Sequence, residues 1–207
     1  MRYALLALVA LCGCVSEDEP SVYVDLVSDR CDFQHFTPPP QVGLLVWGDR
    51  YCTASYVSEH ALLTAAHCVD GPRRDGYFRS IGVEWPLDIA FLARDVDVAV
   101  VYLPQGPDIA PLQIGETTPD EPELLVSWGT GCRLDREPAA RTVYGTTDRA
   151  VGSGVCVCPG DSGGPLIAAD GEVVGVLSGS ALNGQGMDDP SFAPASAGAA
   201  LIWQHDL

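Results

Sequence analysis

The chain has 207 residues, enough to bury a substantial hydrophobic core as one domain or one two-lobed unit. Its net charge of -17 argues against nucleic-acid binding, because neutralising phosphates requires clusters of Lys and Arg and the whole chain has only 11 of them. With 22 glycines and 16 prolines the chain is rich in turn-forming residues, so we expect many short strands.

The N-terminus has the pattern of an export signal. Arg2 is followed by the apolar run Ala4–Leu11, which is too short to span a membrane permanently. The sequence Leu11-Cys12-Gly13-Cys14 resembles a bacterial lipobox and predicts a signal peptide over residues 1–13, with Cys14 lipidated. An ordinary cleaved signal is the alternative. Both interpretations place the protein outside the cytosol, either lipid-anchored to the bacterial envelope or secreted, where disulfides persist.

Residues 14–38 are predicted to form a lipid tether and lead-in segment. They lead into Thr37-Pro38-Pro39-Pro40, whose prolines fit neither a helix nor a central strand. From residue 41 onward, short β-rich runs alternate with turn signals such as Asp70-Gly71-Pro72. We expect six strands here, namely Val42–Trp47, Thr53–Val57, Ala61–Thr64, Ile81–Glu84, Ile89–Leu92 and Val98–Leu103.

A second set of strands follows Pro104–Pro122, a segment rich in Pro, Gly and acids that we interpret as the crossover between two lobes. Gly179–Pro194 is predicted to be loop, and Ala195–His205 is predicted to be a short terminal helix because it contains good helix formers. The fold class is therefore all-β. The strands expected in this half are Leu124–Trp128, Arg141–Tyr144, Pro165–Ala168 and Val173–Ser178.

One segment, Pro159–Leu166, presents a serine among glycines. Glycine permits the tight turn and the close approaches that would let the hydroxyl of Ser162 stand clear of the backbone. A serine hydroxyl is a weak nucleophile at neutral pH, so it needs an adjacent base. His67, within Thr64–Cys68, is the candidate base, since imidazole changes its protonation near neutral pH.

Acidic residues that could orient that base lie before the apolar run Val98–Leu103. Asp97 directly precedes the run, whereas Asp88 and Asp95 are rivals by position. An acidic residue before a buried strand is more commonly just a solvated strand end, so the position alone does not assign a role.

Together the three segments resemble the chymotrypsin/trypsin family of serine proteases, in the chain order His, Asp, Ser. The resemblance covers roughly residue 39 to the end and implies two antiparallel six-stranded β-barrels with the active site between them. The first barrel would span about 39–108 and the second about 109–194, followed by the helix at about 195–205.

The resemblance also implies a role for each residue. Ser162 would be the nucleophile, His67 the general base and then acid, and Asp97 the residue that orients His67. The backbone N–H groups of Gly160 and Ser162 would form the oxyanion hole, and Asp161 would hold the loop in shape. The strand that pairs with the substrate backbone would contribute Ser178, Gly179 and Ser180.

The sequence departs from the family pattern in three places. One concerns Cys158, which matches a family cysteine whose partner lies after the serine, whereas no cysteine follows Ser162. Around Asp25–Val27 there is neither a basic residue nor a Gly-Gly, so an activation site is not recognisable and Asp161 needs another partner, or the enzyme is made in active form. Cys156 stands six residues before the serine, where many relatives set primary specificity. A cysteine offers no charge for Lys or Arg, so trypsin-like specificity is not supported.

The eight cysteines are interpreted through the same resemblance, which implies a disulfide between Cys52 and Cys68. Four others, Cys31, Cys132, Cys156 and Cys158, allow three pairings. A bridge between Cys156 and Cys158 would be strained, so we expect Cys132 to pair with one of them and Cys31 with the other. A zinc site is the rival interpretation, but an oxidising location argues against it, and no metal or cofactor is expected.

The leading functional hypothesis is a monomeric serine endopeptidase that acts on protein or peptide substrates and touches the membrane only through its lipid anchor. One alternative is a protease-like binding module that uses the fold as a scaffold. Another is an esterase with the same three catalytic residues. Fold alone does not decide among them, because function lies in the site.

Overall fold

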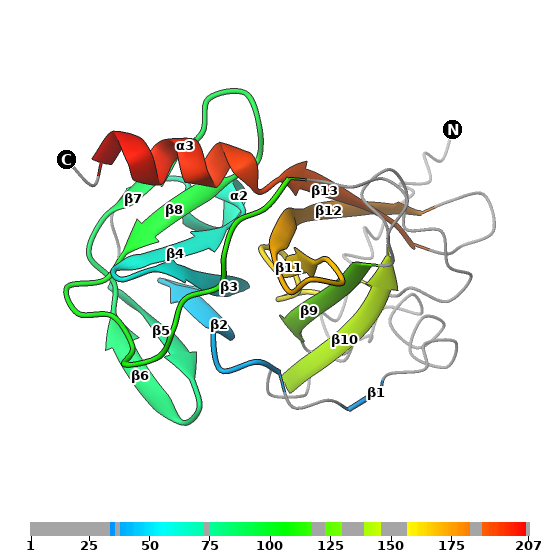
Figure 1. Ribbon diagram of the computed structural model, residues 1–207, viewed down its shortest axis with the longest axis horizontal. Helices are drawn as coiled ribbons and strands as arrows, with labels where there is room; N and C mark the ends of the chain where they lie inside the picture. Colours follow the sequence, from blue (N-terminus) through cyan, green and yellow to red (C-terminus); the bar gives the residue numbers. More distant parts are fainter. Residues whose placement is uncertain are drawn as a thin grey trace, which may run out of the picture.

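The computed structural model describes residues 34–35, 38–72, 75–116, 123–129, 139–145, 157–182 and 188–205. Within them the chain forms two antiparallel sheets that lie side by side, and a C-terminal helix follows the second sheet and packs on the first (Figure 1). None of the helices in this part of the chain has the length and apolar character needed to cross a bilayer.

The first sheet has seven strands in the spatial order β6-β5-β2-β3-β4-β8-β7. Every residue of β2 is buried, in keeping with its continuous apolar sequence, and β2 joins β3 through a two-residue turn in which Gly48 adopts a φ of 64°. The strands are β2 (Val42–Trp47), β3 (Arg50–Ser58), β4 (Ala61–Thr64), β5 (Gly76–Ser80), β6 (Val83–Pro86), β7 (Ala90–Leu92) and β8 (Ala99–Tyr102).

The second sheet has six strands in the order β1-β10-β9-β11-β12-β13. Its hairpin between β11 and β12 closes through Gly171, whose φ of 92° favours glycine. Two helices accompany the sheets, α2 (Ala66–Val69) and α3 (Ser196–His205). The strands are β1 (Gln34–His35), β9 (Glu123–Gly129), β10 (Ala139–Gly145), β11 (Pro165–Ile167), β12 (Val173–Leu182) and β13 (Asp188–Pro194).

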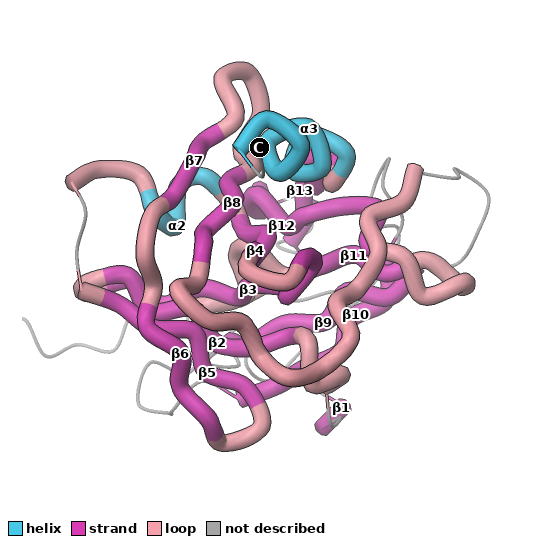
Figure 2. Tube along the Cα trace, turned by 60° about the vertical axis from the view of Figure 1, so that its left-hand side comes forward, coloured by secondary structure: helices cyan, strands magenta, loops and turns pink. Residues whose placement is uncertain are grey.

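The hydrophobic core joins the two sheets. Its largest cluster combines residues of the first sheet, such as Leu62 and Phe78, with Val173 and Val176 of β12. The helix α3 closes this core from above β4 and β8, as Figures 1 and 2 show, and Gly198 permits the contact because a Cβ there would come within 2.2 Å of the Leu63 side chain. Shared packing of this kind fixes the position of one lobe relative to the other.

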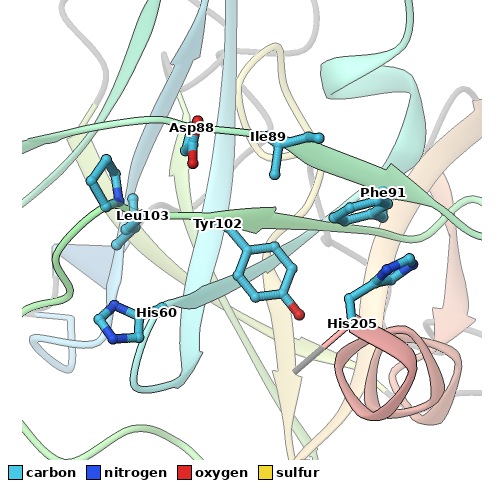
Figure 3. A pocket seen from close by; sticks show the side chains of 8 residues that line it. His60, Asp88, Ile89, Phe91, Tyr102, Leu103 and His205 are labelled. Atoms are coloured by element: carbon cyan, nitrogen blue, oxygen red, sulfur yellow. The ribbon is translucent and has the colours of Figure 1, made fainter. Parts of the chain in front are cut away.

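The first sheet also carries an open hollow of about 460 Å³ on the side next to α3 (Figure 3). The ring of Phe91 stacks on the imidazole of His205 with centroids 3.6 Å apart, which ties the end of α3 to β7. This hollow is lined by none of His67, Asp97 and Ser162, although the rival carboxylate Asp88 lies there. Its lining residues are His60, Asp88, Ile89, Phe91, Tyr102, Leu103, Pro104 and His205.

The all-β prediction with a terminal helix is confirmed, but the prediction of two six-stranded barrels is not. The described strands form a seven-stranded and a six-stranded sheet, and the edge strands β6 and β7 of the first sheet do not pair with each other in this part of the chain. The predicted strand Ile81–Glu84 is wrong at its start, because Ile81 and Gly82 form the turn between β5 and β6, with Ile81 at a φ of 46°, while Val83 and Glu84 do belong to β6.

The loop predicted for Gly179–Pro194 is also wrong over most of its described residues. The strand β12 continues to Leu182, and β13 pairs with it from Asp188 to Pro194. The predicted signal peptide over 1–13, the lipidated Cys14, and the tether over 14–38 apart from residues 34–35 and 38 lie outside the described residues. Those assignments and the predicted lobe boundaries stay predictions.

Candidate functional site

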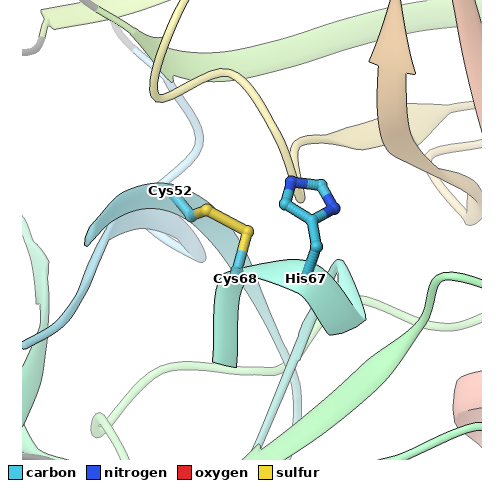
Figure 4. A group of neighbouring side chains, drawn as sticks. All are labelled: Cys52, His67 and Cys68. Atoms are coloured by element: carbon cyan, nitrogen blue, oxygen red, sulfur yellow. A yellow bond between two sulfur atoms is a disulfide. The ribbon is translucent and has the colours of Figure 1, made fainter. Parts of the chain in front are cut away.

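The candidate base, His67, lies in the single turn of helix α2 that follows β4. The disulfide between Cys52 of β3 and Cys68 of α2 fixes this turn to the neighbouring strand, with Cα atoms 6.1 Å apart. Figure 4 shows the disulfide and the imidazole beside each other at this turn. The side chain of His67 is 44% exposed, so the ring remains accessible. The disulfide implied by the sequence is thus confirmed.

An ion pair that sequence reasoning missed holds the other end of α2. The guanidinium of Arg50, at the start of β3, donates to the carboxylate of Asp70 and to the backbone carbonyl of His67. Donation to a carbonyl near the C-terminal end of a helix satisfies an acceptor that lacks an intrahelical partner. No local pattern in the sequence links these residues, because they are brought together by the pairing of β3 with its neighbours.

The carboxylate of Asp97 makes two hydrogen bonds to His67. Its Oδ2 lies 2.6 Å from the imidazole Nδ1, and its Oδ1 accepts the backbone N–H of His67 at 2.9 Å. Two contacts from one carboxylate fix both the ring and the backbone of the histidine. The rivals are placed elsewhere: Asp88 lines the hollow next to α3, and Asp95 is exposed.

Ser178 adds a third hydrogen bond to this carboxylate. Its hydroxyl donates to Oδ2 of Asp97 at 2.7 Å. The register of β12 against β13 shifts between Leu177 and Gly179, so Ser178 lies at a bulge, a feature that re-aims side chains near functional sites. Sequence reasoning nominated Ser178 for substrate contact and missed its bond to Asp97.

The hydrogen bonds shift the acidity of Asp97. Burial by itself would raise the pKa of this carboxyl, but the bond from Ser178 and the bonds from the backbone and side chain of His67 together outweigh it, and the pKa is lowered. Asp97 therefore stays ionised to lower pH than an ordinary aspartate. An ionised carboxylate at Nδ1 favours the tautomer that leaves Nε2 free to accept a proton.

Ser162 lies in a turn that its glycines make possible. Gly160 and Gly163 adopt φ values of 95° and 83°, a region that other residues rarely enter. The turn is tied to β12, since Gly163 N–H donates to Leu177 O at 2.8 Å and Leu177 N–H donates back to Gly164 O at 2.9 Å. Its path is thus fixed by backbone bonds on both sides of the serine.

The serine turn lies against the histidine turn. The carbonyl oxygen of Ser162 is 3.9 Å from the Sγ of Cys68 and accepts the backbone N–H of Thr53 at 2.8 Å. Within the residues that the structure describes, the Ser162 hydroxyl makes no hydrogen bond to His67. In unliganded enzymes the hydrogen bonds of catalysis are often long, and they tighten only when substrate is bound.

Asp161 is fully buried beneath the serine turn. Its Oδ2 accepts the N–H of Cys158 at 2.7 Å, while its own N–H donates to the carbonyl of Cys158 at 3.0 Å. The sequence left open which group would engage Asp161, and Cys158 supplies one local answer. In the described part of the chain, the N–H groups of Gly160 and Ser162 donate to no protein acceptor.

Of the remaining nominated residues, some lie in the described part of the chain and others do not. Gly179 and Ser180 lie in β12 opposite Ser191 and Pro190 of β13. Cys158 is buried and disulfide-bonded. The predicted specificity residue Cys156, together with Cys31 and Cys132, lies outside the described residues, so the pairing of these cysteines stays a prediction.

Cys52, His67 and Cys68 bring potential ligand atoms within 4.8 Å of one another. They are not a metal site, because the two sulfurs are bonded to each other and a disulfide provides no thiolate ligand. In this cluster the disulfide holds the histidine turn against β3.

The fold is similar to those of two solved proteases and of one inactivated protease paralogue. Neuropsin, a serine protease of mouse brain, superimposes with a TM-score of 0.69 over 86% of this chain and 100% of its own, at 16% identity. A Glu endopeptidase gives 0.71 over 86% and 98%, at 14% identity. A scabies mite inactivated protease paralogue gives 0.66 over 84% and 95%, at 16% identity. These likenesses define the fold, and the last shows that the fold can occur in an inactivated relative.

The sequence carries the assignment further. The model of the family described as trypsin-like peptidase domain matches residues 52–176, more than half of the chain, and the protein belongs to that family. A curated relative, the vitellin-degrading protease of Bombyx mori, is 25% identical in a 175-residue alignment that covers 62% of this chain and 66% of that protein, just under two thirds of its length.

Proposed function

We propose that this protein is a serine endopeptidase in which Ser162, His67 and Asp97 form the catalytic triad. The observation that carries the proposal is the double contact between Asp97 and His67, with Ser178 as a further donor to the same carboxylate. A structural ion pair would not require the carboxylate to engage both the ring and the backbone of an accessible histidine beside a glycine-bounded serine. Membership in a peptidase family supports the same conclusion.

In the proposed first step, the Oγ of Ser162 attacks the carbonyl carbon of a peptide bond while Nε2 of His67 takes the hydroxyl proton. The substrate oxygen becomes an oxyanion, and the N–H groups of Gly160 and Ser162 are available to donate to it. Removing one such donor typically costs about 10²–10³ in rate. Collapse of the intermediate expels the amine, which receives its proton from His67, and leaves an ester on Ser162.

In the second step, water attacks the ester carbonyl with His67 again as the base. A second tetrahedral intermediate expels the Ser162 alkoxide, which takes a proton back from His67, and the carboxylic acid product departs. Asp97 stays ionised throughout and stabilises the imidazolium that forms in each half-reaction. Its lowered pKa suits that role, because protonation would abolish the charge that the imidazolium faces.

The location of the enzyme is part of the proposal. Disulfides persist in oxidising compartments, and both the Cys52–Cys68 bridge and the bonded Cys158 fit an extracytoplasmic protein. We place it on the bacterial envelope through a lipid on Cys14, or in the medium if the signal is simply cleaved. Its substrates are proteins or peptides, without selection for Lys or Arg by a charge at Cys156.

The proposal is tested by assaying the purified protein and its Ser162→Ala variant against a peptide library and against short ester substrates. The expected result is peptide cleavage by the wild type and a loss of at least about 10³-fold in the variant. Cleavage of esters without peptides would replace the proposal by the esterase. An inactive wild type that still binds a folded partner would replace it by the binding module.

A further inference from the structure

Thr53, next to the bridged Cys52, lies directly beneath the serine turn. It is fully buried in β3, and two of its groups reach the turn. Its backbone N–H donates to the carbonyl of Ser162 at 2.8 Å, and its hydroxyl donates to the carbonyl of Gly160 at 2.8 Å. One residue of the first sheet therefore holds both ends of the three-residue segment that would form the oxyanion hole.

The hydrogen bond to Gly160 fixes the direction of a whole peptide group. A peptide bond is planar and trans, so anchoring the Gly160 carbonyl on Thr53 also aims the N–H of Asp161 in the opposite direction, where it donates to Cys158 O at 3.0 Å. Glycine has the widest backbone freedom of any residue, and a peptide group next to Gly160 can rotate unless something outside the turn restrains it. Thr53 supplies that restraint from the first sheet.

The support for Thr53 continues into β4. The hydroxyl of Thr64 donates to the carbonyl of Thr53 at 2.7 Å. Gly163 packs against this pair so closely that a Cβ on it would lie 2.2 Å from both the Thr53 carbonyl oxygen and the Thr64 hydroxyl. The serine turn is therefore packed so closely against β3 and β4 that it cannot shift toward them.

We propose that Thr53 is a positioning residue that holds the Gly160 and Ser162 N–H groups in the orientation needed to bind the oxyanion. This inference rests on the proposed function. The groups that hold the serine turn, namely the N–H and hydroxyl of Thr53 and the hydroxyl of Thr64, belong to strands β3 and β4. They are therefore in place without any cleavage of the chain. It accounts for how the serine turn keeps its shape in a sequence that has no recognisable activation site.

The test compares three variants by their kinetics on a peptide substrate. Thr53→Val removes the hydroxyl while keeping the side-chain shape, and Thr53→Ser keeps the hydroxyl. Ser55→Ala removes a buried hydroxyl from the same face of the same strand, and that hydroxyl has no hydrogen-bond partner among the described residues. The first change alone should disorient the oxyanion donors.

We expect Thr53→Val to lower kcat about 10-fold while KM changes less than about twofold, because the lost interaction acts mainly in the transition state. The rate of fluorophosphonate labelling should fall in proportion. The pH midpoint of kcat/KM should stay in place, since the pair of His67 and Asp97 is untouched. Thr53→Ser should restore kcat to within about threefold of the wild type, and Ser55→Ala should leave it unchanged.

An unchanged kcat in Thr53→Val, or a loss that Thr53→Ser does not restore, would overturn the inference. Should Thr53→Val fail to fold, Thr53→Ala removes the same hydroxyl without the second branch and is judged by the same criteria. Ser162→Ala separates the two claims: if it retains activity, the proposed function fails. If it is inactive while Thr53→Val is fully active, only the positioning role fails.

Discussion

Replacing Gly163 by alanine tests whether the serine turn is packed as tightly as the structure indicates. Gly163 has a φ of 83°, and the new Cβ would lie 2.2 Å from the Thr53 carbonyl oxygen and from the Thr64 hydroxyl. Both atoms belong to buried strands and cannot move aside cheaply. Gly171 provides the matched control, because it has a φ of 92° and nothing lies within 4 Å of its Cβ position.

The two substitutions share their backbone cost and their effect on the unfolded chain. A left-handed conformation costs an alanine about 1–2 kcal/mol, and the lost freedom of the unfolded state offsets about 0.4–1 kcal/mol in either variant. Only Gly163→Ala adds steric crowding, for which overpacked interiors suggest about 1–3 kcal/mol more. We therefore expect Gly163→Ala to be less stable than Gly171→Ala by about 1–3 kcal/mol, and to lose activity that Gly171→Ala keeps.

Urea unfolding of the wild type and both variants measures these differences directly, because the linear dependence on denaturant yields each free energy of unfolding. The reasoning is refuted if the two variants differ by less than about 0.5 kcal/mol. It is also refuted if Gly163→Ala retains full peptidase activity.

Three further outcomes follow from the same contacts. Replacing Cys52 and Cys68 together by alanine should lower the free energy of unfolding by about 3 kcal/mol, from the entropy of a loop with a separation of 16, and a loss below about 1 kcal/mol would contradict this. The lowered pKa of Asp97 makes its carboxylate stabilising above the unfolded value of about 3.9, and that contribution is lost as pH falls through the folded value. The stability advantage of the wild type over Asp97→Asn should therefore shrink as the pH is lowered below the unfolded pKa of about 3.9 in acid unfolding, and a constant advantage would argue against it. Arg50 and Asp70 are about half exposed, so Arg50→Met should cost less than about 1 kcal/mol in thermal unfolding, and a larger loss would show that their pairing is structural.

Some strands of the first sheet could be predicted from the sequence because they are continuous apolar runs bounded by turn residues, whereas β5 (Gly76–Ser80), with its mixed sequence, was not predicted. Val42–Trp47 and Ala61–Thr64 were predicted with their observed bounds. The failures have a common cause, since Ile81 is apolar yet occupies a turn, and Asp188–Pro194 is polar and proline-containing yet forms the edge strand β13. Ile81 lies in the tight turn of the β5–β6 hairpin, and β13 pairs with the preceding strand β12, so hairpin pairing sets both conformations against the local composition.

The candidate site was predictable where its chemistry is written in short motifs. His67 and Ser162 could be predicted from the short motifs that contain them, and Asp97 from its position directly before an apolar strand. Thr53 did not, because a threonine after a cysteine has no local signature, and its role arises only when β3 is laid beneath the serine turn. The hydrogen bond from Ser178 to Asp97 likewise depends on a bulge in β12 that no sequence pattern predicted.

The most direct test of the central claim is to treat the protein with a fluorophosphonate probe and map the adduct by mass spectrometry. The account predicts one adduct per chain, on Ser162, absent from Ser162→Ala and formed at least about 10²-fold more slowly by His67→Ala, because the hydroxyl then lacks its base. Labelling that is absent from the folded wild type, or that persists unchanged in Ser162→Ala, would contradict it.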